Sequence, residues 1–198
     1  MRQRPDSSGR RSAASEEMGN ALRVANRLWR DLDAVQAEAW HAYARSLIAR
    51  DPETGLLATP KAVNLFVGLT VKVLQVHGGF DAPIDPPTGV FLGDVVGLTA
   101  FADGADIVFT ADRANRDGVL TELLTQRLNG PNNAPRPRSY KSQGFVAFPG
   151  LGSESRVTLR PGTFYCAYRF VEAASGRTGA MVPIGRVTVT AWPEIEAA

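Results

Sequence analysis

The chain has 198 residues, of which 44% are hydrophobic and 21% are charged, so it can bury a substantial core and is expected to fold over most of its length. Its formal net charge is only +2, and the two signs alternate after the first eleven residues, which argues against a surface that attracts nucleic acid as a whole. The single cysteine, Cys166, excludes an intrachain disulfide. The sequence has neither an apolar run of roughly 18 residues nor the apolar core of a secretory signal. We therefore expect no membrane partner and a cytoplasmic or virion location.

The first 14 residues contain Arg2, Arg4, Arg10 and Arg11 among Ser, Gly, Pro and Ala, with almost no apolar side chain to bury. Such a segment cannot offset the entropy lost on ordering, so residues 1–14 are predicted to form a disordered basic arm. Most arms of this kind are simply solvated. The alternative is that the four arginines contact nucleic acid or a neighbouring subunit.

Two amphipathic helices are predicted next. Apolar residues recur at intervals of three and four from residue 15 to residue 32, which is the period of a helix. Asp33 can then cap a second helix, and Gln36 completes a capping box. The Pro- and Gly-containing segment 51–55 ends this second helix.

A third helix is predicted to begin at Thr59 and Pro60, because a capping hydroxyl is followed by a proline at the first helical position. Gly78 and Gly79 predict its end. The many β-branched residues between them leave a strand as an alternative, but the caps and the length favour a helix. Residues 15–79 are therefore interpreted as a helical domain.

The remaining chain has the pattern of an all-β module. Residues 80–93 are rich in proline and are predicted to be a linker. After them the apolar period changes from 3.6 to 2, and Asp-Gly, Asn-Gly-Pro and Pro-Gly turns separate short apolar runs. These runs predict seven strands, at residues 95–102, 105–111, 119–128, 142–148, 155–159, 163–171 and 185–192.

Seven short strands with regularly spaced turns are typical of an immunoglobulin-like sandwich. We therefore predict an α+β fold in which two or three N-terminal helices precede a seven-stranded antiparallel β-sandwich over residues 94–192, with residues 193–198 as a tail. The one long loop, residues 132–139, carries Arg136 and Arg138 and is predicted to project from the sandwich.

Residues 159–165 have the pattern L-x-P-G-T-x-Y, which resembles the signature at the start of the sixth strand of fibronectin type III domains. The resemblance covers roughly residues 94–190. It implies that the hydroxyl of Tyr165 bonds back to upstream backbone as a tyrosine corner. The tryptophan usual on the second strand of that family is absent, and Phe109 is its candidate replacement.

The same strand departs from the family pattern. Arg169 shares a face with Tyr165, where the family usually buries an aliphatic residue, whereas Phe164, Tyr168 and Phe170 make the other face strongly apolar. Either a bulge changes the register or both faces are covered. We interpret the apolar face as a candidate surface for the helices or for another subunit.

The helical half has a second resemblance. Residues 29–44 have the spacing W-x-x-L-x-x-x-Q-x-x-x-W-x-x-Y-A ahead of a further helix and a proline-rich linker. This arrangement is similar to that of uncharacterised bacterial and prophage-encoded proteins and of phage structural proteins, which implies a structural role in an oligomer. Trp29, Trp40 and Tyr43 are then either a helical core or residues that dock onto the sandwich or another subunit.

No local motif indicates catalysis or a cofactor. His41 and His77 fall on different predicted helices, and only Glu38 lies at ligand spacing from one of them, which disfavours a metal site. Cys166 lies in mid-strand among aromatic residues, where a thiol is usually buried and unreactive. We therefore expect no enzyme, no cofactor and no metal.

Three functional hypotheses follow. The first is a non-enzymatic structural or assembly protein, a homo-oligomeric subunit of a phage-like particle whose helical segment docks onto the sandwich. The second is a protein- or glycan-binding module that uses the sandwich loops, above all residues 129–139. The third is nucleic-acid binding through the basic arm and that loop.

Overall fold

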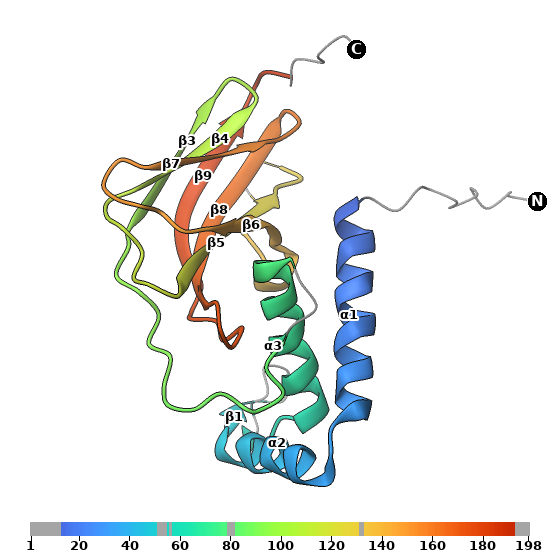
Figure 1. The fold of residues 1–198 in the computed structure, drawn as a ribbon. Helices are drawn as coiled ribbons and strands as arrows, with labels where there is room; N and C mark the ends of the chain where they lie inside the picture. The colour runs from blue at the N-terminus through green and yellow to red at the C-terminus, as the bar shows by residue number, and fades with distance from the viewer. Residues whose placement is uncertain (1–12, 51–54, 56, 79–81, 131–132, 193–198) are drawn as a thin grey trace, which may run out of the picture. The chain divides into compact units, whose positions relative to one another are not determined.

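The protein has an α+β fold in which three helices precede antiparallel sheets (Figure 1). The computed structural model describes residues 13–50, 55, 57–78, 82–130 and 133–192. The chain divides into two compact units, residues 1–88 and residues 89–198. Within the described residues, no helix combines the length and apolar character that crossing a bilayer requires.

Two predicted segments fall largely outside the described residues. One is the basic arm, whose Arg2, Arg4, Arg10 and Arg11 all precede the first described residue. The other is the tail at residues 193–198. Both therefore stay predictions.

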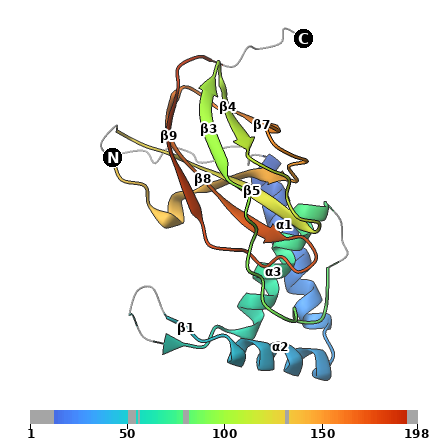
Figure 2. The ribbon, with the colours of Figure 1, turned by 90° about the vertical axis from the view of Figure 1, so that its left-hand side faces the viewer.

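The first unit contains the helices α1 (Ala13–Asp31), α2 (Ala34–Ser46) and α3 (Ala62–His77). Helices α1 and α3 lie side by side and run in opposite directions, while α2 crosses near one end of the pair (Figures 1 and 2). A short antiparallel ribbon of β1 (Ala49–Arg50) and β2 (Leu57–Ala58) lies between α2 and α3 in the chain.

The helix boundaries follow from local hydrogen bonds. The Asp33 carboxylate accepts from the backbone N–H of Gln36 at 2.8 Å, and the Gln36 side chain accepts from the N–H of Asp33 at 3.0 Å, so the predicted capping box is confirmed. Gly78 ends α3 in the left-handed conformation, with φ of 60°. The predicted start of α3 is wrong, because Lys61 is the N-cap and its carbonyl accepts the first helical hydrogen bonds, so the Thr59-Pro60 pair lies ahead of the helix.

Aromatic side chains form the core where the three helices meet. The ring of Trp40 packs edge-on against Phe66 and Tyr43, with centroid distances of 5.1 Å and 5.7 Å, and Trp29 meets Phe66 at 5.5 Å. The indole N–H of Trp40 donates to the carbonyl of Ile84 at 2.7 Å, which attaches the proline-rich segment to α2.

These contacts decide between the two interpretations of Trp29, Trp40 and Tyr43. The three side chains pack into a hydrophobic cluster of their own unit, as the helical-core alternative predicts and the interaction-surface alternative does not. Trp40 is only 2% exposed and has no surface to offer a partner. Trp29 and Tyr43 are half-buried.

The second unit contains two antiparallel sheets, with strand orders β3-β4-β7 and β6-β5-β8-β9. A single 3₁₀ turn, η1 (Pro137–Ser139), lies between β5 and β6. Gly104 and Gly118, both with positive φ, turn the chain ahead of β4 and β5. The strands are β3 (Leu98–Asp103), β4 (Asp106–Ala111), β5 (Val119–Arg127), β6 (Lys141–Val146), β7 (Glu154–Thr158), β8 (Gly162–Glu172) and β9 (Val182–Val189).

The two sheets share one hydrophobic core, an arrangement that fits a β-sandwich-like fold. Side chains alternate between the faces of each strand. The inner face of β4 supplies Ile107 and Phe109, and the inner face of β8 supplies Phe164, Tyr168 and Phe170. The last three are each at most 6% exposed. Their predicted role as a partner-facing surface is therefore wrong, because the face that they occupy is the inner one.

A buried tyrosine ties β8 to the segment before β3. The hydroxyl of Tyr168 donates to the carbonyl of Val96 at 3.0 Å, and both groups are buried. Tyr165 lies on the opposite face of β8 and is half-buried, and its hydroxyl has no hydrogen-bond partner among the described residues. Among the described residues, Tyr165 therefore does not make the bond to upstream backbone that the resemblance implied, and Tyr168 is the core-facing tyrosine of β8.

The opposite face of β8 carries an ion pair. The Arg169 side chain donates from Nε to the Glu122 carboxylate at 2.6 Å, and the side chain of Glu122 is 1% exposed. The register between β8 and β9 also shifts between Cys166 and Ala167.

The segment before β3 is anchored rather than free. Burial opposes ionisation of Asp94, but backbone N–H groups, an amide and the guanidinium of Arg116 stabilise its carboxylate and hold its pKa below the usual value. Arg177 donates from Nη1 to the carbonyl of Gly89 at 2.7 Å. The stretch predicted as a linker, residues 80–93, is thus attached to the two-sheet unit at its C-terminal end.

Candidate functional site

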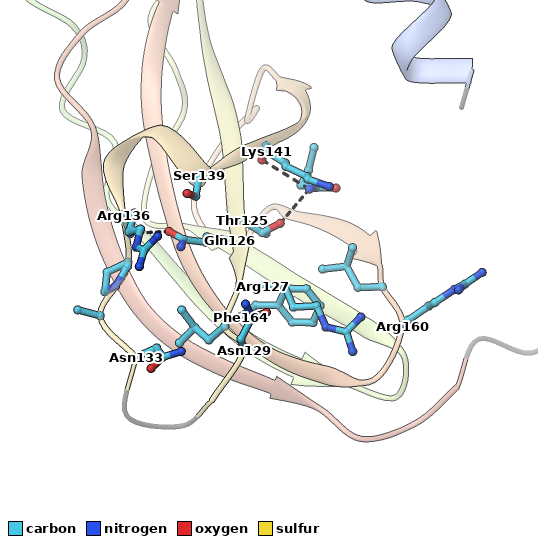
Figure 3. A pocket seen from close by; sticks show the side chains of 15 residues that line it. Thr125, Gln126, Arg127, Asn129, Asn133, Arg136, Ser139, Lys141, Arg160 and Phe164 are labelled. Carbon is cyan, nitrogen blue, oxygen red and sulfur yellow. Dashed lines mark hydrogen bonds between the residues drawn. The ribbon is translucent and has the colours of Figure 1, made fainter. Parts of the chain in front are cut away.

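A pocket of about 720 Å³ opens at one end of the two-sheet unit (Figure 3). Its wall combines the end of β5, the connection from β5 to β6, the start of β6 and the turn from β7 into β8. The lining residues come from two stretches of the chain, residues 125–143 and 159–164, which only the folded unit brings together. The volume falls within the range of about 300–1,000 Å³ that is usual for ligand pockets.

The pocket is cationic. Four lining side chains carry a positive charge, and none of the described lining residues is acidic. The cations are Arg127, Arg136, Lys141 and Arg160, and all four are exposed. The side chains of Arg136, Lys141 and Arg160 form no hydrogen bond or ion pair with the described residues, so their charges remain available to a ligand.

Arg127 is the cation held in place by the protein. It is the last residue of β5 and donates from Nη2 to the carbonyl of Pro161 at 2.8 Å. Its guanidinium lies against Gly162, where an added Cβ would come to 3.0 Å from Nε. The glycine of the β7–β8 turn therefore makes room for this arginine, and a larger residue would displace it.

The connection from β5 to β6 is fixed at several points around the pocket. The N–H of Asn133 donates to Gly130 at 3.2 Å, and the N–H of Arg136 donates to the side-chain oxygen of Gln126 at 2.8 Å. The guanidinium of Arg186 on β9 donates to the carbonyl of Asn133 at 3.4 Å. These bonds orient the loop before any ligand arrives, which lowers the entropic cost of binding.

The floor of the pocket mixes apolar and neutral polar groups. Leu128 and Phe164 are buried there. The amide of Gln143 donates to the hydroxyl of Thr125 at 2.8 Å, which leaves its side-chain oxygen as an acceptor. Gln126 uses its oxygen for the loop and keeps its N–H groups as donors.

The groups in the described lining of a kind that can act in acid–base or nucleophilic catalysis are the hydroxyls of Thr125 and Ser139 and the amine of Lys141. The described lining contains no carboxylate, imidazole or thiol. Cys166 is fully buried, and burial raises the pKa of its thiol to about 12, which makes a thiolate nucleophile unfavourable near neutral pH. Among the described residues, no group of three or more His, Cys, Asp or Glu side chains is placed to hold a metal ion.

The predicted site residues divide into three groups. Arg136 lines the pocket. Arg138 lies on the same loop, in η1, and is exposed without being a lining residue. The aromatic candidates belong to the cores of the two units, and the arginines of the arm lie outside the described residues.

Sequence reasoning missed Arg127, Lys141 and Arg160. The signal was present, since Arg127 ends β5, Lys141 begins β6 and Arg160 lies in the turn between β7 and β8. In an antiparallel sandwich, strand ends from distant parts of the chain meet at the same edge, so cations at such positions can form one site.

Comparison with known proteins gives no family for this chain. No protein-family model matches it, and no curated protein does. Among solved structures, the family 76 glycoside hydrolase from a bovine Bacteroides thetaiotaomicron strain matches with a TM-score of 0.35 and 11% identity, over 48% of this chain and 20% of that one. A likeness this weak carries no inference about fold or function.

Proposed function

We propose that the protein is a non-enzymatic binding module that holds an anionic ligand in the cationic pocket. The observation that carries this proposal is the set of four cations around a cavity whose described lining has no acid. Elsewhere in the two-sheet unit, arginines are paired with carboxylates, as in Arg156 with Asp103 at 2.7 Å and Arg177 with Glu172 at 2.7 Å. Like charges gathered without counter-ions favour an anionic partner.

Binding without catalysis is supported by the chemistry of the lining. Amides, hydroxyls and cations bind and orient a ligand, but they are poor proton acceptors near neutral pH. The pocket also lies at a loop edge of a sandwich, where folds of this kind commonly place recognition.

We also propose that the two-sheet unit is a seven-stranded sandwich of the fibronectin type III kind. The support is the division into antiparallel sheets of three and four strands around one core. Phe109, on the second strand of this unit, is fully buried where the resemblance expects a tryptophan.

The structural or assembly role proposed from the sequence now has less support than ligand binding. It depended on a surplus of apolar surface, and Trp40, Phe164, Tyr168 and Phe170 are buried in their own units. It retains the basic arm and the resemblance to phage structural proteins. Nucleic-acid binding retains only the arm and the cations of the pocket.

The proposal is tested with polyvinyl sulfate, a polyanion that contains no sugar, peptide or base, and with uncharged polyvinyl alcohol. Isothermal titration is carried out at about 0.1 M salt, where the Debye length is about 10 Å. It should show binding of polyvinyl sulfate and no binding of polyvinyl alcohol. The double variant Arg136→Ala/Arg160→Ala should weaken it at least tenfold, since charge-assisted hydrogen bonds contribute about 1.5–3 kcal/mol each.

The matched control is Arg27→Ala/Arg113→Ala, which removes the same charge from side chains that are 85% and 56% exposed and distant in sequence from the pocket. If the two double variants bind equally weakly, the polyanion senses net charge and the pocket is not its site.

A further inference from the structure

We infer that the ligand of the pocket is an acidic oligosaccharide, with at least two carboxylate or sulfate groups on a hydroxyl-rich backbone. This inference rests on the proposed function and names the ligand class. Four features carry it: the spread of the cations, the neutral groups between them, the absence of a stacking surface among the described lining residues and the state of the neighbouring strand edge.

The cations surround the pocket instead of converging on one point. Figure 3 shows Arg136 on one side and Arg160 on the far side, with Arg127 between them and Lys141 on a third side. A ligand that contacts cations on opposite sides of the pocket must extend across it. The arrangement therefore fits an extended ligand that carries several separated negative charges.

The groups between the cations both donate and accept hydrogen bonds. Asn129, Asn133 and Ser139 line the pocket beside the two glutamines. A ligand with anionic groups alone would leave the amide oxygens without donors. Sugar hydroxyls supply donors and acceptors at once, and the amides satisfy both.

Single-stranded nucleic acid fits the lining poorly. Proteins that hold single strands stack the bases on aromatic side chains, which contribute about 1–3 kcal/mol per base. Phe164 is the aromatic residue among the described lining residues, and it is 5% exposed. The pocket therefore offers phosphate-binding charge without a surface for the bases.

An extended acidic peptide also fits poorly. Such peptides commonly add a strand to a free sheet edge, and the edge beside the pocket is β6. The pairing of β6 with β5 is interrupted near Gly144, which has φ of 130°, and the amide of Gln143 lies 3.5 Å from the carbonyl of Lys141. An edge strand that is bulged, and in which a side-chain amide already approaches a backbone carbonyl, is a poor template for another strand.

The experiment compares six-charge ligands by isothermal titration at about 0.1 M salt: hexagalacturonate, hexaglutamate and an oligothymidylate with six phosphates. A chondroitin sulfate hexasaccharide, which carries one carboxylate and one sulfate per disaccharide, serves as the sulfated arm. One of the two oligosaccharides should bind at least tenfold more tightly than the peptide and the oligonucleotide. Arg136→Ala and Arg160→Ala should each weaken that binding about tenfold.

A neutral variant separates sugar recognition from charge attraction. Asn129→Ala should weaken oligosaccharide binding about two- to tenfold, the range of one hydrogen bond. It should weaken polyvinyl sulfate binding less, because that polymer can accept from the amide N–H groups but has no hydroxyl to donate to the amide oxygen.

Hexaglutamate or oligothymidylate binding as tightly as both oligosaccharides would overturn the ligand class and leave the proposed function standing. An Asn129→Ala variant with unchanged oligosaccharide affinity would also count against the ligand class. If no anionic probe binds, polyvinyl sulfate included, the proposed function fails together with this inference.

Discussion

Replacing Tyr168 by phenylalanine is the most direct test of how β8 is held. The ring would keep its place in the core, and the change would remove only the hydroxyl that donates to the carbonyl of Val96 at 3.0 Å. Val96 is 2% exposed, so water cannot readily replace the lost donor. A buried acceptor left without a partner costs about 1–3 kcal/mol.

This loss should be visible in thermal unfolding. A change of 1 kcal/mol shifts the melting temperature of a domain of this size by roughly 4 °C, so Tyr168→Phe should lower it by roughly 4–12 °C. Calorimetry of the full chain is the preferred assay, because the two compact units can unfold in separate transitions. The loss of the far-ultraviolet helical signal identifies the transition of the helical unit, so the other transition belongs to the sheets.

Tyr165→Phe is the matched control, since it removes the same atom from the same strand. The hydroxyl of Tyr165 has no hydrogen-bond partner among the described residues, so this variant should change the free energy of unfolding by less than about 0.5 kcal/mol. The reasoning is refuted if Tyr165→Phe is the more destabilising of the two, as a tyrosine corner at that position requires.

Three further outcomes are expected. Burial raises the pKa of the Cys166 thiol from 9.0 to about 12. The stability that the neutral thiol contributes should therefore be present below pH 9.0 and lost as pH rises toward 12. Urea unfolding should show this loss in the parent protein and not in Cys166→Val. Asp94→Asn should lower the free energy of unfolding by about 1–3 kcal/mol near neutral pH, and the difference should vanish as pH falls through the depressed pKa of Asp94, as measured by urea unfolding. Trp40→Phe removes the indole donor to Ile84 and should destabilise the helical unit by about 1–3 kcal/mol, measured as an earlier loss of helical circular dichroism.

The helices show how far local chemistry predicts structure. The capping box of Asp33 and Gln36 and the glycine after α3 involve residues within one turn of each other, so their effect can be predicted from spacing alone. The start of α3 could not. Thr59 and Pro60 favour a helix start, but the adjoining β2 pairs Leu57 and Ala58 with β1, and the helix begins only after that ribbon has ended.

The strand faces show where local patterns fail. The alternation in β8 correctly grouped Phe164, Tyr168 and Phe170, but a pattern of period two does not say which face lies inside. The resemblance placed Tyr165 inward. The three aromatic residues have more apolar surface to bury than Tyr165 and Arg169, and they occupy the core, while Arg169 pairs with Glu122 on the other face.

The pocket was only partly predictable for a different reason. The one pocket cation that was predicted, Arg136, lies in the long loop that was expected to project from the sandwich. Arg127, at the end of β5, and Arg160, in the turn before β8, are brought together only by the fold, since Arg127 pairs with Phe164 of β8. Sequence can predict loops that project, but the meeting of distant strand ends depends on register.

The charge of the pocket also depends on the fold and not on the sequence alone. A net charge of +2 argued only against a surface that attracts polyanions as a whole, because the two signs alternate along the chain. In the folded unit, however, acids neutralise arginines at some places, as Asp94 does for Arg116 and Glu122 for Arg169. Each such pairing takes a carboxylate away from the remaining cations. A nearly neutral chain can thus carry a locally unbalanced pocket, and its field depends on which charges the fold has already paired.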